Sequence, residues 1–427
     1  MIRISRLSNN IPFVREEMGY LGTVSLGVWV KCGSAYENHD NNGMAHLVEH
    51  MLFKGTGSKN ATEISDVMTS LGSGFNAYTA KEFTCFYVTV LTEHLSSAVS
   101  LLAEMLTDSV FDENEFKREK DVVLDEIALY NDSPDDAVYE MLEKSVWKDH
   151  PLGFQISGDE EQVGAYTRDE LYDFYQKNYV SGNIVISAAG NFDDDKLVEL
   201  LQSKFEKIKS GPENSGLTVP EYRRCIYVEK KDTDQIYLNV CMPGCTVNAP
   251  DRYADSVIET ILGGSESSRL FRKVRDEKGL TYSISSSTDS YICAGLSFAD
   301  VIVDREKMGI TLETILDIIK DIRKSGITER ELIRTKEQVK SELMIEAEST
   351  RYRMSSYGKG MLFRNRAMSA GEVIDMINSV DIEACMNVAG KYLDTENLSV
   401  SVVGPVTKND VNFIKNLTGI STVLDKS

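Results

Sequence analysis

The chain has 427 residues, of which 42% are hydrophobic and 26% are charged, the proportions of an ordinary soluble protein with two or three domains. A net charge of −21 argues against nucleic acid and anionic membranes as partners, and no apolar run approaches the roughly 18 residues of a membrane-spanning helix. The N-terminal stretch lacks the apolar segment of a leader, so we expect no signal or transit peptide and a cytoplasmic location.

A strand and a helix near the N-terminus carry the most informative motif. Residues 24–32 alternate as in a strand, and a helix is expected to follow over residues 43–53. This helix holds His46, Glu49 and His50 in an H-x-x-E-H pattern, which is typical of zinc peptidases. Positions four apart on a helix differ by about 40°, so the two imidazoles share one face and the glutamate lies beside them. Zinc binding and hydrolysis are the chemistry that this pattern favours.

The ends of this helix should be set by short polar residues and a glycine. We expect Asn41 or Asn42 to cap its start and Gly55 to end it. The elements that follow are a short helix opened by Asn60 and Glu63, strands over 75–79 and 84–90, a helix over 94–107, helices capped by Asp112 and by Thr167 with Glu170, and a strand over 183–190.

A catalytic zinc needs three protein ligands and one open position, so a third ligand must come from another element. The helix that begins at Asp112 presents Glu119 and Glu126, which are seven positions apart and therefore lie on the same face. An apolar run between them indicates that this part of the helix is at least partly buried. Carboxylates are costly to bury unless they are paired or bind a metal. Either glutamate could supply the third ligand on this reasoning, whereas a solvated helix face remains the alternative.

The second half of the sequence repeats the first. Residues 396–404 echo 182–190 at a displacement of 214 positions, and residues 282–307 echo the hairpin region from Phe75 onwards. A helix over 253–262 occupies the place of the histidine helix but has no histidine. Two copies at half the chain length predict a duplicated domain rather than a solenoid. The expected fold class is α+β, with two duplicated α/β-roll domains, each a mostly antiparallel sheet packed with helices.

The predicted domains follow from this repeat. A catalytic, zinc-binding domain is expected over residues 1–208, a linker over 209–224 and a homologous domain without metal over 225–427. The seven cysteines form no C-x-x-C pair, so we expect buried free thiols: Cys32, Cys85, Cys225, Cys241, Cys245, Cys293 and Cys385.

With these motifs, the chain resembles the pitrilysin- or insulinase-type (M16) zinc metallopeptidases of the processing-peptidase-like subfamily, over nearly its whole length. In that family the inverted motif is followed by Glu-x6-Glu, whose last glutamate lies some 76 residues beyond the second histidine, as Glu126 does here. The resemblance implies the LuxS/MPP-like metalloprotease fold and one Zn²⁺ per chain, bound by His46, His50 and Glu126. It makes Glu49 the general base that activates the zinc-bound water, and it makes Glu119 a catalytic-site carboxylate that orients a ligand or the base.

The same resemblance implies how substrate is held. Asn76, Ala77 and Thr79 match the Asn-Ala-x-Thr edge strand to which peptides add as a further strand, although an ordinary edge strand is an equal alternative. Arg275 and Tyr282 match an Arg-x6-Tyr element that contacts substrate and supports the developing oxyanion. Because one chain carries both the zinc motif and this element, the implied assembly is a homodimer that encloses a chamber.

The predicted function is therefore a zinc-dependent endopeptidase that hydrolyses peptides or unfolded polypeptide segments. Specific processing of a precursor is an alternative for the same chemistry. A non-catalytic core subunit of a larger complex is a second alternative, and a thioether-cleaving zinc lyase, which resembles this fold and motif as a single short domain, is a third. The retained motif argues against the core subunit, and the duplication argues against the lyase.

Overall fold

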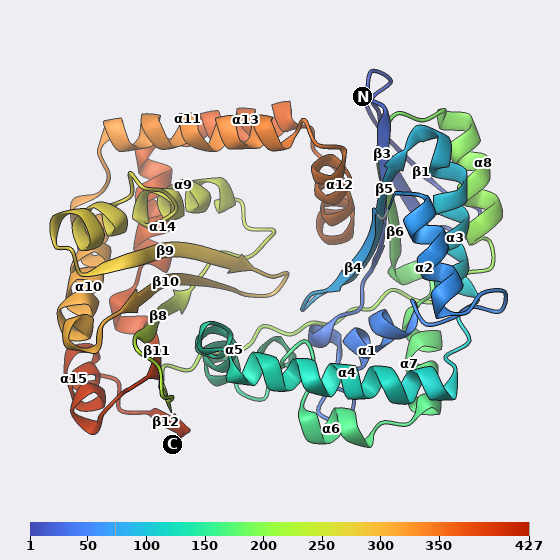
Figure 1. The fold of residues 1–427 in the computed structure, drawn as a ribbon. Helices are drawn as coiled ribbons and strands as arrows, with labels where there is room; N and C mark the ends of the chain where they lie inside the picture. Colours follow the sequence, from blue (N-terminus) through green and yellow to red (C-terminus); the bar gives the residue numbers. More distant parts are fainter. Residues whose placement is uncertain (73, 427) are drawn as a thin grey trace. The chain divides into compact units, whose positions relative to one another are not determined.

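The computed structural model describes residues 1–72 and 74–426, and the chain forms two compact units in it. Unit 1 comprises Met1–Ala128, Phe154–Gly216 and Leu343–Ala370. Unit 2 comprises Leu129–Gly153, Leu217–Glu342 and Gly371–Ser427. Each unit is built on one sheet, and helices pack on both faces of that sheet (Figure 1).

The sheet of unit 1 has, within the described residues, six strands in the order β1-β2-β6-β3-β5-β4. All neighbouring strands pair antiparallel except β2 with β6, which pair parallel. The central strands are buried on both faces, as the unbroken apolar run Thr23–Val30 requires. The strands are β1 Ile2–Arg6, β2 Pro12–Glu17, β3 Thr23–Val30, β4 Phe75–Thr79, β5 Thr84–Leu91 and β6 Ile184–Gly190.

The sheet of unit 2 repeats this plan. Over the described part of the chain its order is β12-β7-β11-β8-β10-β9, so that β7-β11-β8-β10-β9 corresponds, strand by strand and direction by direction, to β2-β6-β3-β5-β4. Only the outer strand differs: β1 is antiparallel to its neighbour, whereas β12 is parallel to β7. The strands are β7 Ile226–Lys230, β8 Ile236–Pro243, β9 Thr281–Ser290, β10 Gly295–Val303, β11 Ser399–Gly404 and β12 Val423–Lys426. The predicted α+β class, the duplication and the mostly antiparallel sheets are confirmed.

Helices of unit 1 enclose two apolar layers. The larger core lies between one face of the sheet and helices that include α1, α3 and α7, and the smaller core lies between the other face and α12. Trp29 and Tyr87 of the sheet contact Met354 and Tyr357 of α12 in this second layer. The helices are α1 Met44–Met51, α2 Ala61–Ser70, α3 Leu95–Thr107, α4 Glu113–Asp132, α6 Glu160–Ala165, α7 Arg168–Asn178, α8 Asp194–Phe205 and α12 Thr350–Arg364, with 3₁₀ turns η1 Ser34–Tyr36, η2 Thr92–His94 and η4 Ser181–Asn183.

Unit 2 is layered in the same way, with α9, α10 and α14 on one face of the sheet and α5 on the other. Its helices are α5 Pro134–Val146, α9 Arg252–Leu262, α10 Met308–Ser325, α11 Glu329–Glu346, α13 Ala370–Ser379, α14 Ile382–Tyr392 and α15 Lys408–Thr418, with a π-helical segment η5 Phe271–Glu277 and 3₁₀ turns η3 Pro151–Gly153, η6 Arg305–Lys307 and η7 Thr395–Asn397. The helix α4 continues past Ala128, and α11 continues past Glu342, so each crosses from one unit into the other.

The two units do not coincide with contiguous halves of the sequence. Helix α5, from the first half, packs on the sheet of unit 2, and helix α12, from the second half, packs on the sheet of unit 1. The predicted domains, residues 1–208 and 225–427, are each one continuous segment. The compact units differ from these predicted domains because α5 belongs to unit 2 and α12 to unit 1. Both sheets have apolar side chains on their two faces, so both faces must be covered. In each sheet a helix from the other half of the sequence covers the second face.

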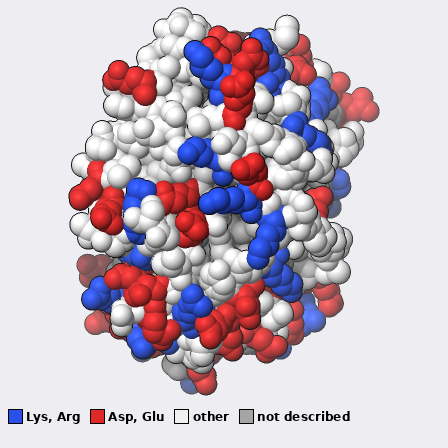
Figure 2. Space-filling view, turned by 90° about the vertical axis from the view of Figure 1, so that its right-hand side faces the viewer, with Lys and Arg blue, Asp and Glu red and all other residues white. Residues whose placement is uncertain are grey.

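Three general features complete the fold. The seven cysteines are free, and Cys293 is the single one that is not fully buried. Within the described residues, no helix is both long enough and apolar enough to span a membrane. Lysine and arginine side chains alternate with aspartate and glutamate over the face of the molecule seen in Figure 2, so the acidic excess does not gather there in one patch.

Candidate metal centre

Helix α1 presents the two motif histidines and starts at a glycine that the local packing requires. Gly43 has a φ of 94°, and a Cβ there would lie 2.7 Å from the carbonyl oxygen of Ser157. The expectation that Asn41 or Asn42 caps this helix is wrong, since the described residues give Gly43 as the N-cap with no side-chain cap of its own.

The carboxylate of Glu37 binds the start of α1 instead. Its oxygens accept hydrogen bonds from the amides of Gly43 (2.8 Å) and Ala45 (2.7 Å) and from the side chain of Asn42 (3.0 Å). Burial raises the pKa of Glu37 to about 7, against the effect of these three hydrogen bonds. Sequence reasoning missed this residue because it lies seven positions before the first residue of the helix and reaches it only through the folded loop.

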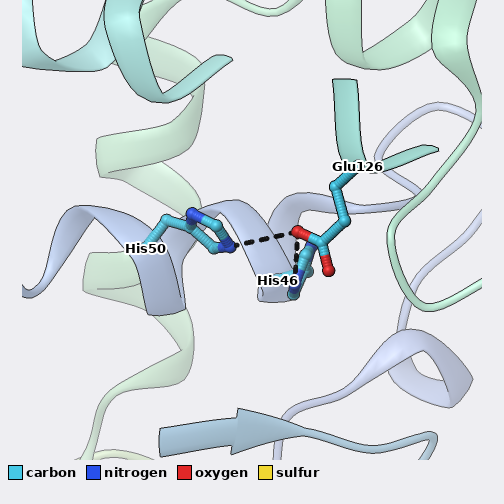
Figure 3. Close-up of side chains that lie close together, drawn as sticks. All are labelled: His46, His50 and Glu126. Carbon is cyan, nitrogen blue, oxygen red and sulfur yellow. Dashed lines mark ion pairs between the residues drawn. The ribbon is translucent and has the colours of Figure 1, made fainter. Parts of the chain in front are cut away.

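Helix α4 brings the third candidate ligand to α1. The Oε2 atom of Glu126 lies 3.6 Å from Nε2 of His50 and 3.9 Å from Nε2 of His46 (Figure 3). One ligand atom from each of the three residues lies within 4.8 Å of the others, the single such metal-binding group found in the described part of the chain. The structure thus brings together the three ligands that the resemblance implied, from two separate helices.

The spacing of these atoms fits zinc. Bonds of about 2.0–2.1 Å from a tetrahedral zinc would place neighbouring nitrogen and oxygen ligands roughly 3.4 Å apart. The observed separations of 3.6 and 3.9 Å are only slightly longer, and all three ligand atoms lie within 4.8 Å of one another. Two imidazoles and one carboxylate also form the donor set of catalytic zinc sites that keep an open fourth position.

Burial prepares His46 to act as a ligand. Burial is the main cause that lowers the pKa of His46 to about 3, and the neighbouring His50 adds to the effect. The ring is therefore neutral at physiological pH and keeps a lone pair for a metal. Its Nδ1 atom is buried and has no hydrogen-bond partner among the described residues, so the second nitrogen of His46 is not held as that of His50 is.

The predicted second carboxylate, Glu119, contacts His50 directly. Its Oε2 lies 3.1 Å from Nδ1 of His50, and its Oε1 lies 2.7 Å from Nζ of Lys54. Burial acts to raise the pKa of Glu119, but the hydrogen bonds from His50 and Lys54 outweigh it and hold the pKa below its ordinary value. An ionised Glu119 accepts the Nδ1 proton of His50 and thereby leaves Nε2 free for the metal. Lys54 was missed, although its spacing of four from His50 is a signal that could have found it.

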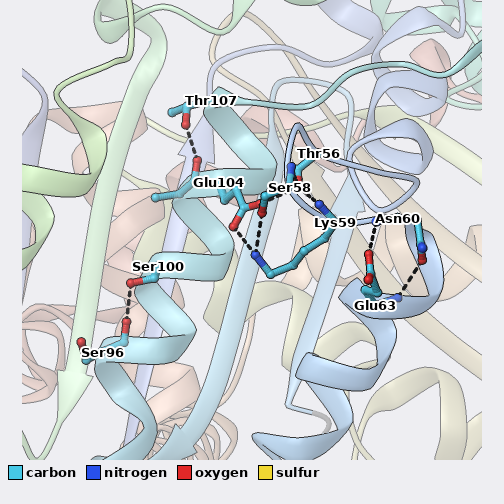
Figure 4. Close-up of polar contacts among 10 residues, drawn as sticks. Thr56, Ser58, Lys59, Asn60, Glu63, Ser96, Ser100, Glu104 and Thr107 are labelled. Carbon is cyan, nitrogen blue, oxygen red and sulfur yellow. Dashed lines mark hydrogen bonds and ion pairs between the residues drawn. The ribbon is translucent and has the colours of Figure 1, made fainter.

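The loop that carries Lys54 away from α1 is fixed to α3. Glu104 of α3 accepts hydrogen bonds from Thr56 and Ser58, both at 2.5 Å, and pairs with Lys59 at 2.7 Å (Figure 4). The Asn60–Glu63 capping box, which the sequence predicted, begins α2 immediately afterwards. Both ends of the motif helix are thus anchored by a carboxylate, one in the preceding loop and one on a neighbouring helix.

Glu49, the predicted general base, points to the edge strand β4. Thr79 donates a hydrogen bond from its hydroxyl to Oε2 of Glu49 at 2.5 Å. Burial raises the pKa of Glu49 above its ordinary value, and the contact with Thr79 opposes this effect. A carboxylate with a raised pKa beside a metal site is suited to accept and return a proton near neutral pH.

The other predicted substrate residues lie in both units. Asn76 and Ala77 are on β4, an outer strand of its sheet, and the side-chain oxygen of Asn76 accepts from the Ala77 amide at 2.9 Å. In unit 2, the guanidinium of Arg275 lies between two rings, 4.5 Å from that of Phe271 and 4.4 Å from that of Tyr282. Tyr282 is 83% exposed, so its hydroxyl faces solvent within that unit.

Comparisons with known proteins cover most of the chain. Residues 15–160 match the family described as Insulinase (Peptidase family M16), and residues 165–339 match the Peptidase M16 inactive domain. The uncharacterized zinc protease YmxG of Bacillus subtilis (strain 168) is 36% identical over 405 residues, which are 95% of this chain and 98% of that protein.

Solved structures share the fold at lower identity. A peptidase M16 inactive domain from Pseudomonas fluorescens aligns with a TM-score of 0.90 and 21% identity, over 95% of this chain and 98% of that one. A chain of Complex III2 from Candida albicans aligns with a TM-score of 0.85 and 18% identity, over 99% of this chain and all of that one. At these identities the two likenesses concern the fold alone.

Proposed function

This chain belongs to the insulinase (M16) family of peptidases, and we propose that it is a zinc-dependent endopeptidase for peptides or unfolded polypeptide segments. The observation that carries the proposal is the convergence of His46, His50 and Glu126, with Glu49 beside them. A bound zinc supplies a Lewis acid that polarises the scissile carbonyl and acidifies a water.

The residues around the metal site have separate roles in the proposed reaction. Glu49 takes the proton of the attacking water and returns it to the nitrogen of the leaving amine. Glu119, paired with Lys54, holds the Nδ1 proton of His50 and fixes the orientation of that ring. An extended peptide adds to the outer strand β4 through main-chain hydrogen bonds, which suits many sequences because side chains contribute only preference.

Three other functions can be weighed against this one. A non-catalytic core subunit is suggested by the likeness to a chain of Complex III2, but the complete ligand set and Glu49 favour a working metal site here. Processing of a specific precursor uses the same chemistry and differs only in substrate choice. The zinc-lyase alternative is disfavoured by the duplicated, two-sheet architecture.

The experiment measures bound zinc and the cleavage of internally quenched peptides by the purified protein. Zinc at one equivalent per chain, with cleavage that a chelator abolishes and added zinc restores, supports the endopeptidase. Zinc binding without cleavage of any member of a diverse peptide library would favour the other assignments. Mass spectrometry of the products separates one defined cut, as in precursor processing, from broad degradation.

A homodimer is the second part of the proposal. We infer that Arg275 and Tyr282 of one protomer act on the peptide at its partner's zinc, because a single chain carries both elements. Chains with Glu49→Gln mixed with chains that carry Tyr282→Phe should recover activity in mixed dimers, since one complete site is then rebuilt. Isolated mixed dimers without any recovery would exclude shared sites.

A further inference from the structure

Thr79 contacts the general base through its side chain. Its hydroxyl donates a hydrogen bond to Oε2 of Glu49 at 2.5 Å. The hydroxyl also lies 3.3 Å from that of Thr84, which itself donates to the carbonyl of Cys32 at 2.8 Å. The Thr84 hydroxyl therefore has a separate acceptor, which leaves the Thr79 hydroxyl proton for Glu49.

The pairing of β4 with β5 decides which backbone groups of β4 remain open. The amide of Thr89 donates to the carbonyl of Gly74, and that of Ala80 donates to the carbonyl of Phe83. Opposite residues of an antiparallel pair alternate between bonded and non-bonded, so in the register of β4 and β5 the backbone groups of residues 75, 77 and 79 point away from β5. These groups form the open edge of the sheet.

One amide on this open edge already has an acceptor in the chain, because the Ala77 amide donates to the side-chain oxygen of Asn76. A peptide that pairs with β4 therefore finds a carbonyl acceptor at Ala77 rather than a free amide. The hydroxyl of Thr79 is directed to Glu49.

We propose that Thr79 is a positioning residue for Glu49, which fixes the base to the strand that receives the peptide. The proposal rests on the proposed peptidase function. It assigns Thr79 the role of orienting Glu49 instead of the predicted role of contacting substrate. Because this hydrogen bond comes from a residue of β4, the carboxylate keeps a set position relative to any peptide on that edge. Misplacement of a catalytic group by even about 1 Å costs large factors in rate.

The test compares Thr79→Val with Thr79→Ser. Valine keeps the shape and the strand preference of threonine but removes the hydroxyl, whereas serine keeps it. Thr107→Val is the matched control, because the Thr107 hydroxyl donates only to the carbonyl of Ala103 within α3 (Figure 4). For each variant, zinc content, kcat and KM on one quenched peptide are measured, and crystal structures of the metal-free proteins show the Glu49 side chain.

We expect Thr79→Val to keep its zinc and its KM and to lose roughly tenfold or more in kcat, as for a lost hydrogen bond to a charged group. Thr79→Ser and Thr107→Val should stay within about threefold of the wild type, and Glu49 should leave its place only in the valine variant. A raised KM with unchanged kcat, or an equal loss in the serine variant, would overturn the proposal. If the zinc-loaded wild type cleaves no peptide, the proposed function fails, and the position of Glu49 in the variant crystals still decides the role of Thr79.

Discussion

The Nδ1 atom of His50 lies 3.1 Å from Oε2 of Glu119, and this contact joins α1 to α4, the two helices that carry the candidate metal ligands. Glu119→Gln keeps the size of the side chain but removes the charge that favours the Nδ1 proton. We expect zinc to bind about 10–100-fold more weakly, the usual cost of losing such a partner. Competition with a chelator of known affinity measures the change.

Glu115→Gln is the control for this prediction. Glu115 lies on the same helix, one turn earlier. Its carboxylate forms an ion pair with Arg118 at 2.7 Å rather than a contact with His50. Its zinc affinity should equal that of the wild type. Equal affinities in both variants would mean that the contact between Glu119 and His50 does not support the ligand.

The second prediction concerns Glu49 itself. Glu49 is not one of the three grouped ligand residues, and its carboxylate is directed to Thr79. Glu49→Gln should therefore bind zinc as the wild type does, while peptide cleavage falls by at least about 100-fold because no group accepts the proton of the water. Zinc analysis and single-turnover cleavage on the same preparation check both statements. Substantial activity in a zinc-replete variant would show that another group is the base.

Much of the candidate site could be predicted because its residues have a characteristic spacing within one helix. The distance of four between His46 and His50 places them on one helical face, whatever the rest of the fold. The third ligand was different: spacing alone left Glu119 and Glu126 as equal candidates, and only the resemblance separated them. The structure gives the physical reason, since Glu126 faces the Nε2 atoms of both rings and Glu119 faces Nδ1 of one.

The parts that escaped prediction are those made by the tertiary fold. Glu37 reaches the start of α1 through a folded loop, and no residue pattern marks it as a cap. The unbroken burial of β3 indicates that both faces of its sheet are covered, but it does not say that α12, more than 300 residues later, covers the second one. Helix exchange between the repeats is invisible to periodicity, because the apolar positions of a helix do not identify the sheet that it covers.

The third prediction tests the packing of α12 on its sheet. A Cβ at Gly358 would lie 2.0 Å from Nε1 of Trp29, which is fully buried and donates to Ser187 at 2.8 Å. Gly358→Ala should destabilise the protein by about 1–3 kcal/mol, the range for an overpacked core. Gly390→Ala in α14 is the control, because a Cβ there meets no atom within 4 Å, and it should stabilise by roughly 0.5–1 kcal/mol. Thermal unfolding of both variants measures the difference, and two equal shifts would contradict the described contact.

The last prediction comes from the second copy of the motif helix. Asp255 and Glu259 on α9 are four positions apart, the same spacing as His46 and His50 on α1. Burial is the main cause that raises the pKa of each to about 7, and Asp255 further raises that of Glu259. Both carboxyls therefore lie in surroundings that favour their neutral forms.

The sign of the pH effect follows from these directions. In the unfolded chain both carboxyls lose their protons near pH 4, whereas in the folded protein they keep them until about pH 7. The folded state binds more protons between these values, so the free energy of unfolding should fall as the pH rises from about 5 to about 8, by at most about 1.4 kcal/mol per pH unit for each group. Glu259→Gln keeps an acceptor for the Ser286 hydroxyl and should flatten this fall, while Asp317→Asn on the exposed side of α10 should not. Melting temperatures at pH 5.5 and 8.5 measure it, and a wild type that becomes more stable toward pH 8.5 would show that these carboxyls are ionised in the fold.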